Sequence, residues 1–176
     1  MLPSSRFVVF DVETTGLTPS AGHRVIEIGA VCLENSVCTC EFHSLIDPGC
    51  KVPAAAQRVH GICDAMLCGQ PGPSAVFPDF HRFIEGAVLV AHNARFDISF
   101  LRHEFSKQRL PLLNGIRCTL ELSRRCLPDL PNYRLQTVAR HLLGGLPLQG
   151  QLHRALDDAR LAARVWVALG TAFTAK

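Results

Sequence analysis

The sequence has no apolar run long enough to cross a bilayer, and its first six residues lack the basic stretch and apolar stretch that begin a secretory leader. It also has little charge, since Asp, Glu, Lys and Arg make up 19% of the chain, and it has no low-complexity tract. These absences exclude membrane-spanning, disordered and fibrous classes. We therefore expect a cytoplasmic protein with no membrane partner.

The eight cysteines include no C-x-x-C pair. Structural zinc sites and thioredoxin-like redox sites both use cysteines at such short, regular spacings. We therefore expect reduced, mostly buried thiols, and a zinc protein is the least favoured interpretation.

A formal net charge of +3 does not by itself identify nucleic acid as a partner. Arginines do concentrate in the second half of the chain, at positions 102, 117, 124, 125, 134 and 140. They would suit contacts with phosphates, but exposed helix faces would explain them equally well.

The apolar pattern predicts one domain over residues 1–176, since 48% of the residues are hydrophobic and can form one core. Alternating or continuous apolar runs predict strands, and helical spacing predicts helices. The strands are expected over 6–11, 24–33, 37–46, 87–91 and 116–119, the helices over 53–60, 73–85, 96–105, 120–126, 135–143 and 155–169, and a loop over 144–151. Pro78 is expected in an early turn of its helix or at a division of it. This order predicts an α/β fold with a mixed five-stranded sheet flanked by helices.

The first chemical motif is Phe10-Asp11-Val12-Glu13-Thr14-Thr15-Gly16, at the end of the first predicted strand. Strand alternation places Asp11 and Glu13 on one face and Val12 on the other. Two carboxylates at that separation repel each other, and a divalent cation with oxygen ligands would relieve the repulsion. A solvated strand end is the structural alternative.

The second motif is Ala91-His92-Asn93-Ala94-Arg95-Phe96-Asp97, a polar exit from a strand into a helix that carries Asp97 in its first turn. Such an aspartate often only complements the helix dipole. The position of Asp97 favours a functional role over a purely structural one, because functional groups collect where strands end and helices begin in open α/β sheets.

The third motif runs from His153 to Arg160. Five helical residues rotate by roughly 500°, so His153 and Asp158 cannot share one face of a regular helix. We therefore expect His153 on the loop before the helix and Asp158 on the helix itself. Spacing leaves Asp157 as an alternative to Asp158.

Together, the three motifs resemble the DnaQ-like, or DEDDh, 3′→5′ exonuclease family, which includes the exonuclease domain of the ε subunit of bacterial DNA polymerase III. They occur in family order with family-like separations, and Val59-His60-Gly61-Ile62 resembles a connecting segment of ε-like members. The resemblance extends over almost the whole chain. It implies an RNase H-like fold and hydrolysis of nucleic acid from its 3′ end.

The resemblance also implies roles for individual residues. Asp11, Glu13, Asp97 and Asp158 would hold two divalent cations, Mg²⁺ or Mn²⁺, which selects Asp158 over Asp157. His153 would be the general base, since imidazole exchanges protons near neutral pH. The expected substrate-binding residues are Thr14, Thr15, Gly16, Leu17, His60, Asn93 and Phe96.

The expected substrate is a single-stranded or frayed 3′ end of DNA, which would be released as nucleoside monophosphates during proofreading, repair or end trimming. A DNA polymerase is a candidate partner, but replicative ε subunits add a C-terminal segment for polymerase attachment. A stand-alone repair or trimming nuclease therefore fits this chain better. Two alternatives stay open, an exoribonuclease or oligonucleotide nuclease of the same superfamily and a non-catalytic nucleic-acid- or polymerase-binding module.

Overall fold

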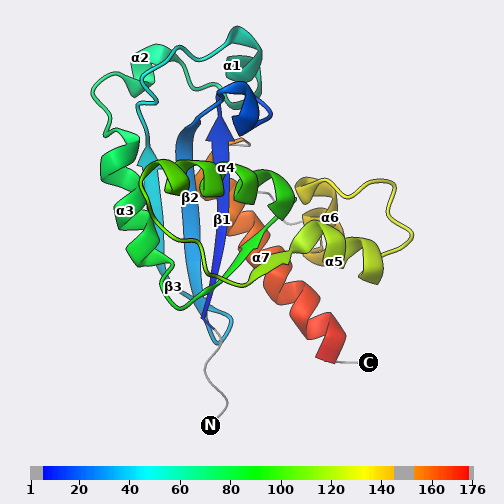
Figure 1. Cartoon of the computed structure of the whole chain (residues 1–176). Coiled ribbons are helices and arrows are strands. Elements are labelled where there is room, and N and C mark those ends of the chain that lie inside the picture. Colours follow the sequence, from blue (N-terminus) through cyan, green and yellow to red (C-terminus); the bar gives the residue numbers. More distant parts are fainter. Residues whose placement is uncertain (1–5, 145–152, 175–176) are drawn as a thin grey trace.

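The computed structural model describes residues 6–144 and 153–174, and its centre is a five-stranded sheet in the order β3-β2-β1-β4-β5 (Figure 1). β1, β2 and β3 form an antiparallel meander, and β4 and β5 pair in parallel with β1 and with each other. The strands are β1 (Arg6–Thr14), β2 (Val25–Glu34), β3 (Val37–Leu45), β4 (Val88–Ala91) and β5 (Ile116–Cys118). The predicted mixed five-stranded sheet is therefore confirmed.

Helices cover both faces of the sheet, with α3 and α4 on one face and α7 with α5 and α6 on the other (Figure 1). The helices are α1 (Ala54–His60), α2 (Asp64–Leu67), α3 (Pro73–Phe83), α4 (Ala94–Lys107), α5 (Thr119–Cys126), α6 (Leu135–Leu142) and α7 (Ala155–Thr174), with a short 3-10 helix η1 (Pro19–Ala21) after β1. No helix in the described part of the chain is long and apolar enough to span a membrane.

The central strand β1 alternates between two hydrophobic cores. Val8, Phe10 and Val12 pack with α3 and α4, whereas Val9 packs with α6 and α7. By the same alternation, Asp11 and Glu13 follow Val9 on the face that α7 covers. The two carboxylates therefore lie near the end of β1 on the same face of the sheet.

Three local predictions differ from the structure. β1 continues through Thr14, so Asp11 and Glu13 lie inside the strand and are held by pairing with β2. α2 was not predicted, because four residues are too few for a helical period. α3 runs unbroken through Pro78, since burial of Val76, Phe77 and Phe80 holds the helix on the sheet. Apart from Gly144, the predicted loop 144–151 lies outside the described residues.

The cysteines are thiols, but the prediction that most are buried is wrong. Cys32 is buried in β2, while Cys38 and Cys40 are exposed on β3 and Cys50 and Cys68 are exposed on loops. β3 is an edge strand with only one neighbouring strand, and its residues from Val37 to Glu41 are all exposed, the two thiols among them.

Gly29 lets α7 approach the sheet. A Cβ atom on Gly29 would lie 2.2 Å from the Leu156 backbone nitrogen and 2.3 Å from its Cα. Gly29 is the cross-strand partner of Asp11, so this contact lies beside the carboxylate pair. The absence of a side chain at position 29 therefore sets the distance between α7 and β2.

Gly29→Ala should destabilise the fold by about 1–3 kcal/mol or more. The added Cβ would overlap backbone atoms of Leu156, so β2 and α7 would have to move apart. Thermal and urea unfolding would measure the change. Gly115→Ala is the control, since its Cβ would meet only the Val88 side chain at 3.8 Å. Equal unfolding midpoints for the two variants would contradict the close contact.

Candidate active site

A pocket of about 650 Å³ opens where β1 and β4 end. This volume is in the range of small-molecule sites. β1 and the loop after it, α1, the β4–α4 loop and the start of α7 all contribute to its lining. The lining residues are Asp11, Val12, Glu13, Thr14, Thr15, Gly16, Leu17, His23, Pro53, Ala55, Ala56, Val59, His60, His92, Asn93, Phe96, Asp97, His153 and Asp158. All twelve residues predicted for the site therefore lie around one pocket.

The four predicted carboxylates come from three elements. Asp11 and Glu13 project from β1, Asp97 from the first turn of α4, and Asp158 from the first turn of α7. Glu13, Asp97 and Asp158 are buried. Asp157 points elsewhere, because its carboxylate bonds to Arg160 at 3.1 Å and it does not line the pocket.

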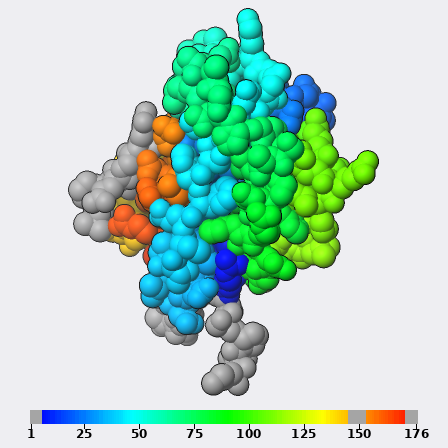
Figure 2. All heavy atoms as spheres, turned by 90° about the vertical axis from the view of Figure 1, so that its left-hand side faces the viewer, coloured from blue at the N-terminus to red at the C-terminus, as the bar shows by residue number. Residues whose placement is uncertain are grey.

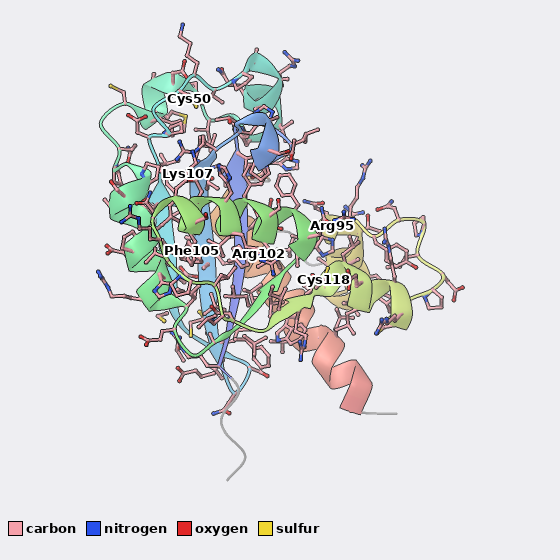
Figure 3. All side chains as sticks on the ribbon, viewed as in Figure 1. Cys50, Arg95, Arg102, Phe105, Lys107 and Cys118 are labelled. Atoms are coloured by element: carbon pink, nitrogen blue, oxygen red, sulfur yellow. The ribbon has the colours of Figure 1, made fainter. Side chains whose placement is uncertain are left out.

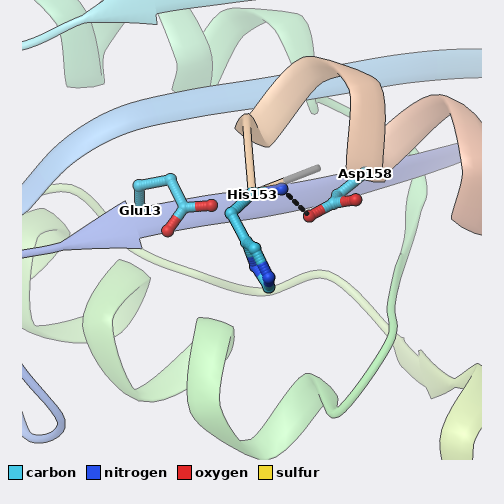
Figure 4. A group of neighbouring side chains, drawn as sticks. All are labelled: Glu13, His153 and Asp158. Carbon is cyan, nitrogen blue, oxygen red and sulfur yellow. Dashed lines mark hydrogen bonds between the residues drawn. The ribbon is translucent and has the colours of Figure 1, made fainter. Parts of the chain in front are cut away.

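The imidazole of His153 lies beside the carboxylates of Glu13 and Asp158 (Figure 4). One ligand atom from each of the three lies within 4.8 Å of the others, and no second group of this kind occurs in the described part of the chain. His153 is exposed, precedes α7, has a φ of 60°, and donates its backbone N–H to Asp158 Oδ2 at 3.2 Å. The predicted position of His153 outside the helix is confirmed.

Burial raises the pKa of every carboxyl in this group, and the charges of the other carboxylates raise the pKa of Asp11 and Glu13 further. Burial is the largest cause for Glu13, followed by the charge of Asp158, and its pKa rises to about 8. Burial raises the pKa of Asp97 to about 7 despite backbone hydrogen bonds that oppose the shift. The pKa of Asp11 and that of Asp158 also rise, mainly through burial. The protein alone does not satisfy these charges, and four oxygen-bearing groups of this kind fit a divalent cation.

The β4–α4 loop forms one wall. Asn93 precedes α4 in the left-handed conformation, with a φ of 71°. The ring of Phe96 packs against Phe100 at 5.1 Å between ring centroids. His92 connects this wall to α5 and to the segment before α6. Its ring nitrogens lie 2.9 Å from Thr119 Oγ1 and 2.8 Å from the Tyr133 carbonyl oxygen.

The loop after β1 forms a second wall. Thr14 Oγ1 donates to the Gly16 carbonyl at 2.6 Å, and Thr15 Oγ1 accepts the Arg24 N–H at 2.9 Å. A Cβ on Gly16 would overlap the His23 ring, and the side chain of Leu17, which is 84% exposed, stands at the rim. These contacts fix the shape of the loop beside the pocket.

His60, at the end of α1, is buried and lines the same wall. Its Nδ1 accepts the Ile62 N–H at 3.0 Å. Its Nε2 lies near the Thr14 backbone but has no well-formed hydrogen bond among the described residues. Burial lowers the pKa of His60, which favours a neutral ring.

The sequence did not identify several residues of this region. The α1 wall, made of Pro53, Ala55, Ala56 and Val59, carries no chemical signal beyond small and apolar side chains. Glu27, a buried carboxylate behind the site, did carry a signal. It is the lone charge within the apolar run from Val25 to Leu33, and a buried charge requires partners.

The fold and the acidic pocket define a protein of the RNase H-like exonuclease class. The exonuclease family model matches residues 8–166, and the chain belongs to that family. The expected family and fold are thereby confirmed.

Curated relatives include DNA polymerase components. The chain is 40% identical over 176 residues to DNA polymerase III subunit epsilon of Rickettsia typhi, covering 96% of this chain and 75% of that protein. It is 39% identical over 161 residues to the PolC-type DNA polymerase III of Caldanaerobacter subterraneus subsp. tengcongensis, covering 92% of this chain and 11% of that protein. The chain thus spans about a tenth of the PolC-type relatives.

Solved structures give the same fold. Exonuclease X in complex with 5′ overhanging duplex DNA superposes with a TM-score of 0.74 and 25% identity, over 94% of this chain and 91% of that chain. E. coli Exonuclease I in complex with a dA16 oligonucleotide superposes with a TM-score of 0.80 and 19% identity, over 95% of this chain and 41% of that chain.

The metal-free protein should lose stability as the pH rises from about 4.5 to 8. A carboxyl whose pKa is higher in the folded state binds more protons folded than unfolded, so stability falls as pH increases between the two values. For Glu13 that window runs from its ordinary 4.5 to about 8. Thermal unfolding with EDTA, and then with Mg²⁺ or Mn²⁺, should show a deficit at pH 8 that the cation removes.

Glu13→Gln is the matched variant for this measurement, because the amide cannot ionise. Its metal-free form should lose less stability than the unmodified protein between pH 6 and 8. Parallel pH profiles for the two proteins would contradict the assignment of the loss to Glu13.

Proposed function

We propose that the protein is a metal-dependent 3′→5′ exonuclease that releases nucleoside monophosphates from the 3′ end of DNA. The observation that carries this proposal is the meeting of four carboxylates and an exposed imidazole in one pocket of nucleotide-sized volume. Membership in the exonuclease family supports the reaction class. The DNA bound to Exonuclease X and the names of the DNA polymerase relatives support DNA as the substrate.

Asp11, Glu13, Asp97 and Asp158 would hold two Mg²⁺ or Mn²⁺ ions. Their fit rests on the oxygen ligands, on burial and on the raised pKa of each carboxyl. Ions in such a pair stabilise both the attacking and the leaving oxygen of an in-line phosphoryl displacement. The protein itself contributes orientation, because the four carboxylates stand on three packed elements, β1, α4 and α7.

His153 is the proposed proton acceptor for the attacking water. It is exposed to the pocket, so a water molecule has access to its ring. Imidazole exchanges protons near neutral pH, as a general base must. Asp158 accepts the His153 backbone N–H, which holds the turn that carries the ring.

The terminal nucleotide would lie against the wall formed by Thr14, Thr15, Gly16 and Leu17. Leu17 and Phe96 offer apolar surface for a base, and stacking on such surfaces tolerates any sequence. Asn93 and His60 are the polar residues proposed to contact this nucleotide. The Nε2 of the neutral, buried His60 has no well-formed hydrogen bond among the described residues, which suits a hydrogen bond to substrate.

The charge distribution supports a nucleic-acid substrate. Residues 92–144 contain nine arginines and lysines, all exposed, and four acidic residues, of which Asp97 and Glu104 are buried. Residues 6–91 contain five basic and nine acidic residues. Arg95 and Arg102 lie on α4 (Figure 3), and His92, just before α4, contacts Thr119 and Tyr133 in the part of the chain that carries Arg125 and Arg134. Phosphates of the strand that leads to the pocket would contact arginines of this basic part of the chain.

Digestion of matched 5′-labelled single-stranded DNA and RNA with Mg²⁺ or Mn²⁺ tests the reaction. A ladder that starts from free 3′ ends, requires metal and is absent from a 3′-blocked strand would support the proposal. Preference for RNA would change the substrate to that of an exoribonuclease, and retention of either strand without cleavage would identify a binding module instead.

Asp11→Asn should reduce cleavage more than about 100-fold while the protein remains folded, because a neutral amide replaces a charged carboxylate at a central ligand position. Asp158→Ala should have a similar effect. Asp157→Ala is the control and should retain most activity, since Asp157 pairs with Arg160 outside the pocket. The reverse order for the two α7 aspartates would show that the wrong residue has been assigned.

Replacing Arg125 and Arg134 with Ala should weaken binding of DNA without lowering kcat. Each lost phosphate contact should reduce the salt dependence of log(kcat/KM) by roughly one unit of slope. Arg82→Ala is the control, because Arg82 is also exposed but pairs with Asp79 in the acidic part of the chain. An unchanged salt dependence of log(kcat/KM) in the double variant would show that Arg125 and Arg134 do not contact phosphates of the substrate.

A further inference from the structure

A fully buried glutamate lies directly behind the candidate site. Glu27 is 0% exposed and is the cross-strand partner of Glu13 on β1. Its Oε1 lies 2.7 Å from His43 Nε2, and both carboxylate oxygens accept hydrogen bonds from Arg154 at 2.7–3.1 Å. Its Oε2 also accepts the Ala155 backbone N–H at 3.1 Å. Burial would raise the pKa of Glu27, but these hydrogen bonds lower it to about 2.

Two of these three partners belong to the start of α7. Arg154 follows His153 directly, and Ala155 is the first residue of the helix. Leu156, the next residue, touches Gly29 on the same strand as Glu27. The beginning of α7 is thus fixed to β2 at three consecutive residues. Figure 2 shows the start of α7 lying against the β2–β3 part of the sheet.

The conformation of His153 gives this attachment a function. A φ of 60° is unfavourable for a residue with a side chain and persists where surrounding contacts determine it. On one side of that turn, the Arg154 side chain bonds to Glu27, and on the other the His153 N–H bonds to Asp158. Because its guanidinium is bound bidentately to a buried carboxylate, Arg154 is turned away from the substrate pocket, which it does not line.

We propose that Glu27 and Arg154 are positioning residues that hold the His153 imidazole beside Glu13 and Asp158. This inference rests on the proposed function, in which His153 accepts a proton. The alternative is that the pair only stabilises α7.

The chain contains a matched control for that alternative. Arg160 also joins α7 to the sheet, through a bidentate contact with Glu41 on β3 at 2.6 and 2.8 Å. It lies farther along α7 and does not line the pocket. Removing either arginine breaks an ion pair between α7 and the sheet, but only Arg154 adjoins His153.

Arg154→Ala should lower kcat at least tenfold and leave KM within about twofold, whereas Arg160→Ala should leave both near their original values. The mechanism is tested by a double-mutant cycle with His153→Ala. If Arg154 acts through His153, Arg154→Ala should cost less than about twofold in the His153→Ala background. Independent, multiplicative losses, or equal losses of kcat in the two arginine variants, would overturn the proposal.

Hydrogen exchange supplies a readout that does not need catalysis. The Ala155 amide should exchange slowly in the unmodified protein and at least tenfold faster in Arg154→Ala, with unchanged exchange in Arg160→Ala. Arg154→Lys keeps a charge and serves for the same comparison if the alanine variant does not fold. Fast exchange of Ala155 in the unmodified protein would overturn the attachment itself. An inactive unmodified protein with a protected Ala155 amide would instead refute the proposed function.

Discussion

Repulsion among the carboxylates at the end of β1 is the constraint on which the rest of the structure depends. Burial raises the pKa of Asp11, and the charges of Asp97, Glu13 and Asp158 raise it further, since burial removes the water that would screen them. Such a group stays together only if each member stands on an element held by other contacts. The bidentate pair between Arg24 and the fully buried Glu104 supplies one of these contacts, since it ties the connection before β2 to α4.

The strand order meets this constraint by placing β1 at the centre. β4 runs parallel to β1, so it ends at the same edge of the sheet and α4 begins there with Asp97 in its first turn. β2 runs antiparallel to β1 and begins at that edge, which places Glu27 opposite Glu13. Residues far apart in sequence therefore meet because of strand direction.

Periodicity predicted the parts of the site that depend on local geometry. Alternation placed Asp11 and Glu13 on one face, and helical rotation placed His153 outside the helix that carries Asp158. Neither rule specifies how α7 meets the sheet, because that depends on Gly29 and on an ion pair between residues 27 and 154. Glu27 was visible as a lone charge in an apolar strand, but its partner could not be chosen among many arginines by spacing. The prediction for Pro78 also failed because it ignored tertiary packing. Burial of α3 against the sheet outweighs the backbone hydrogen bond that Pro78 cannot form, so the helix is not divided.

The cross-strand pair of Glu13 and Glu27 shows how one residue type acquires two different states. Like charges directly opposite each other are destabilising, so at least one of the two must be neutralised. Arg154, His43 and the Ala155 amide all bond to Glu27 and lower its pKa to about 2. No cationic side chain of the described residues forms an ion pair with Glu13, and its pKa rises to about 8. The protein therefore satisfies the charge at the back of the site and leaves the charge in the pocket for an added cation. Because the arginine that does so adjoins His153, the same contact that stabilises the buried glutamate also orients the turn with the proposed base.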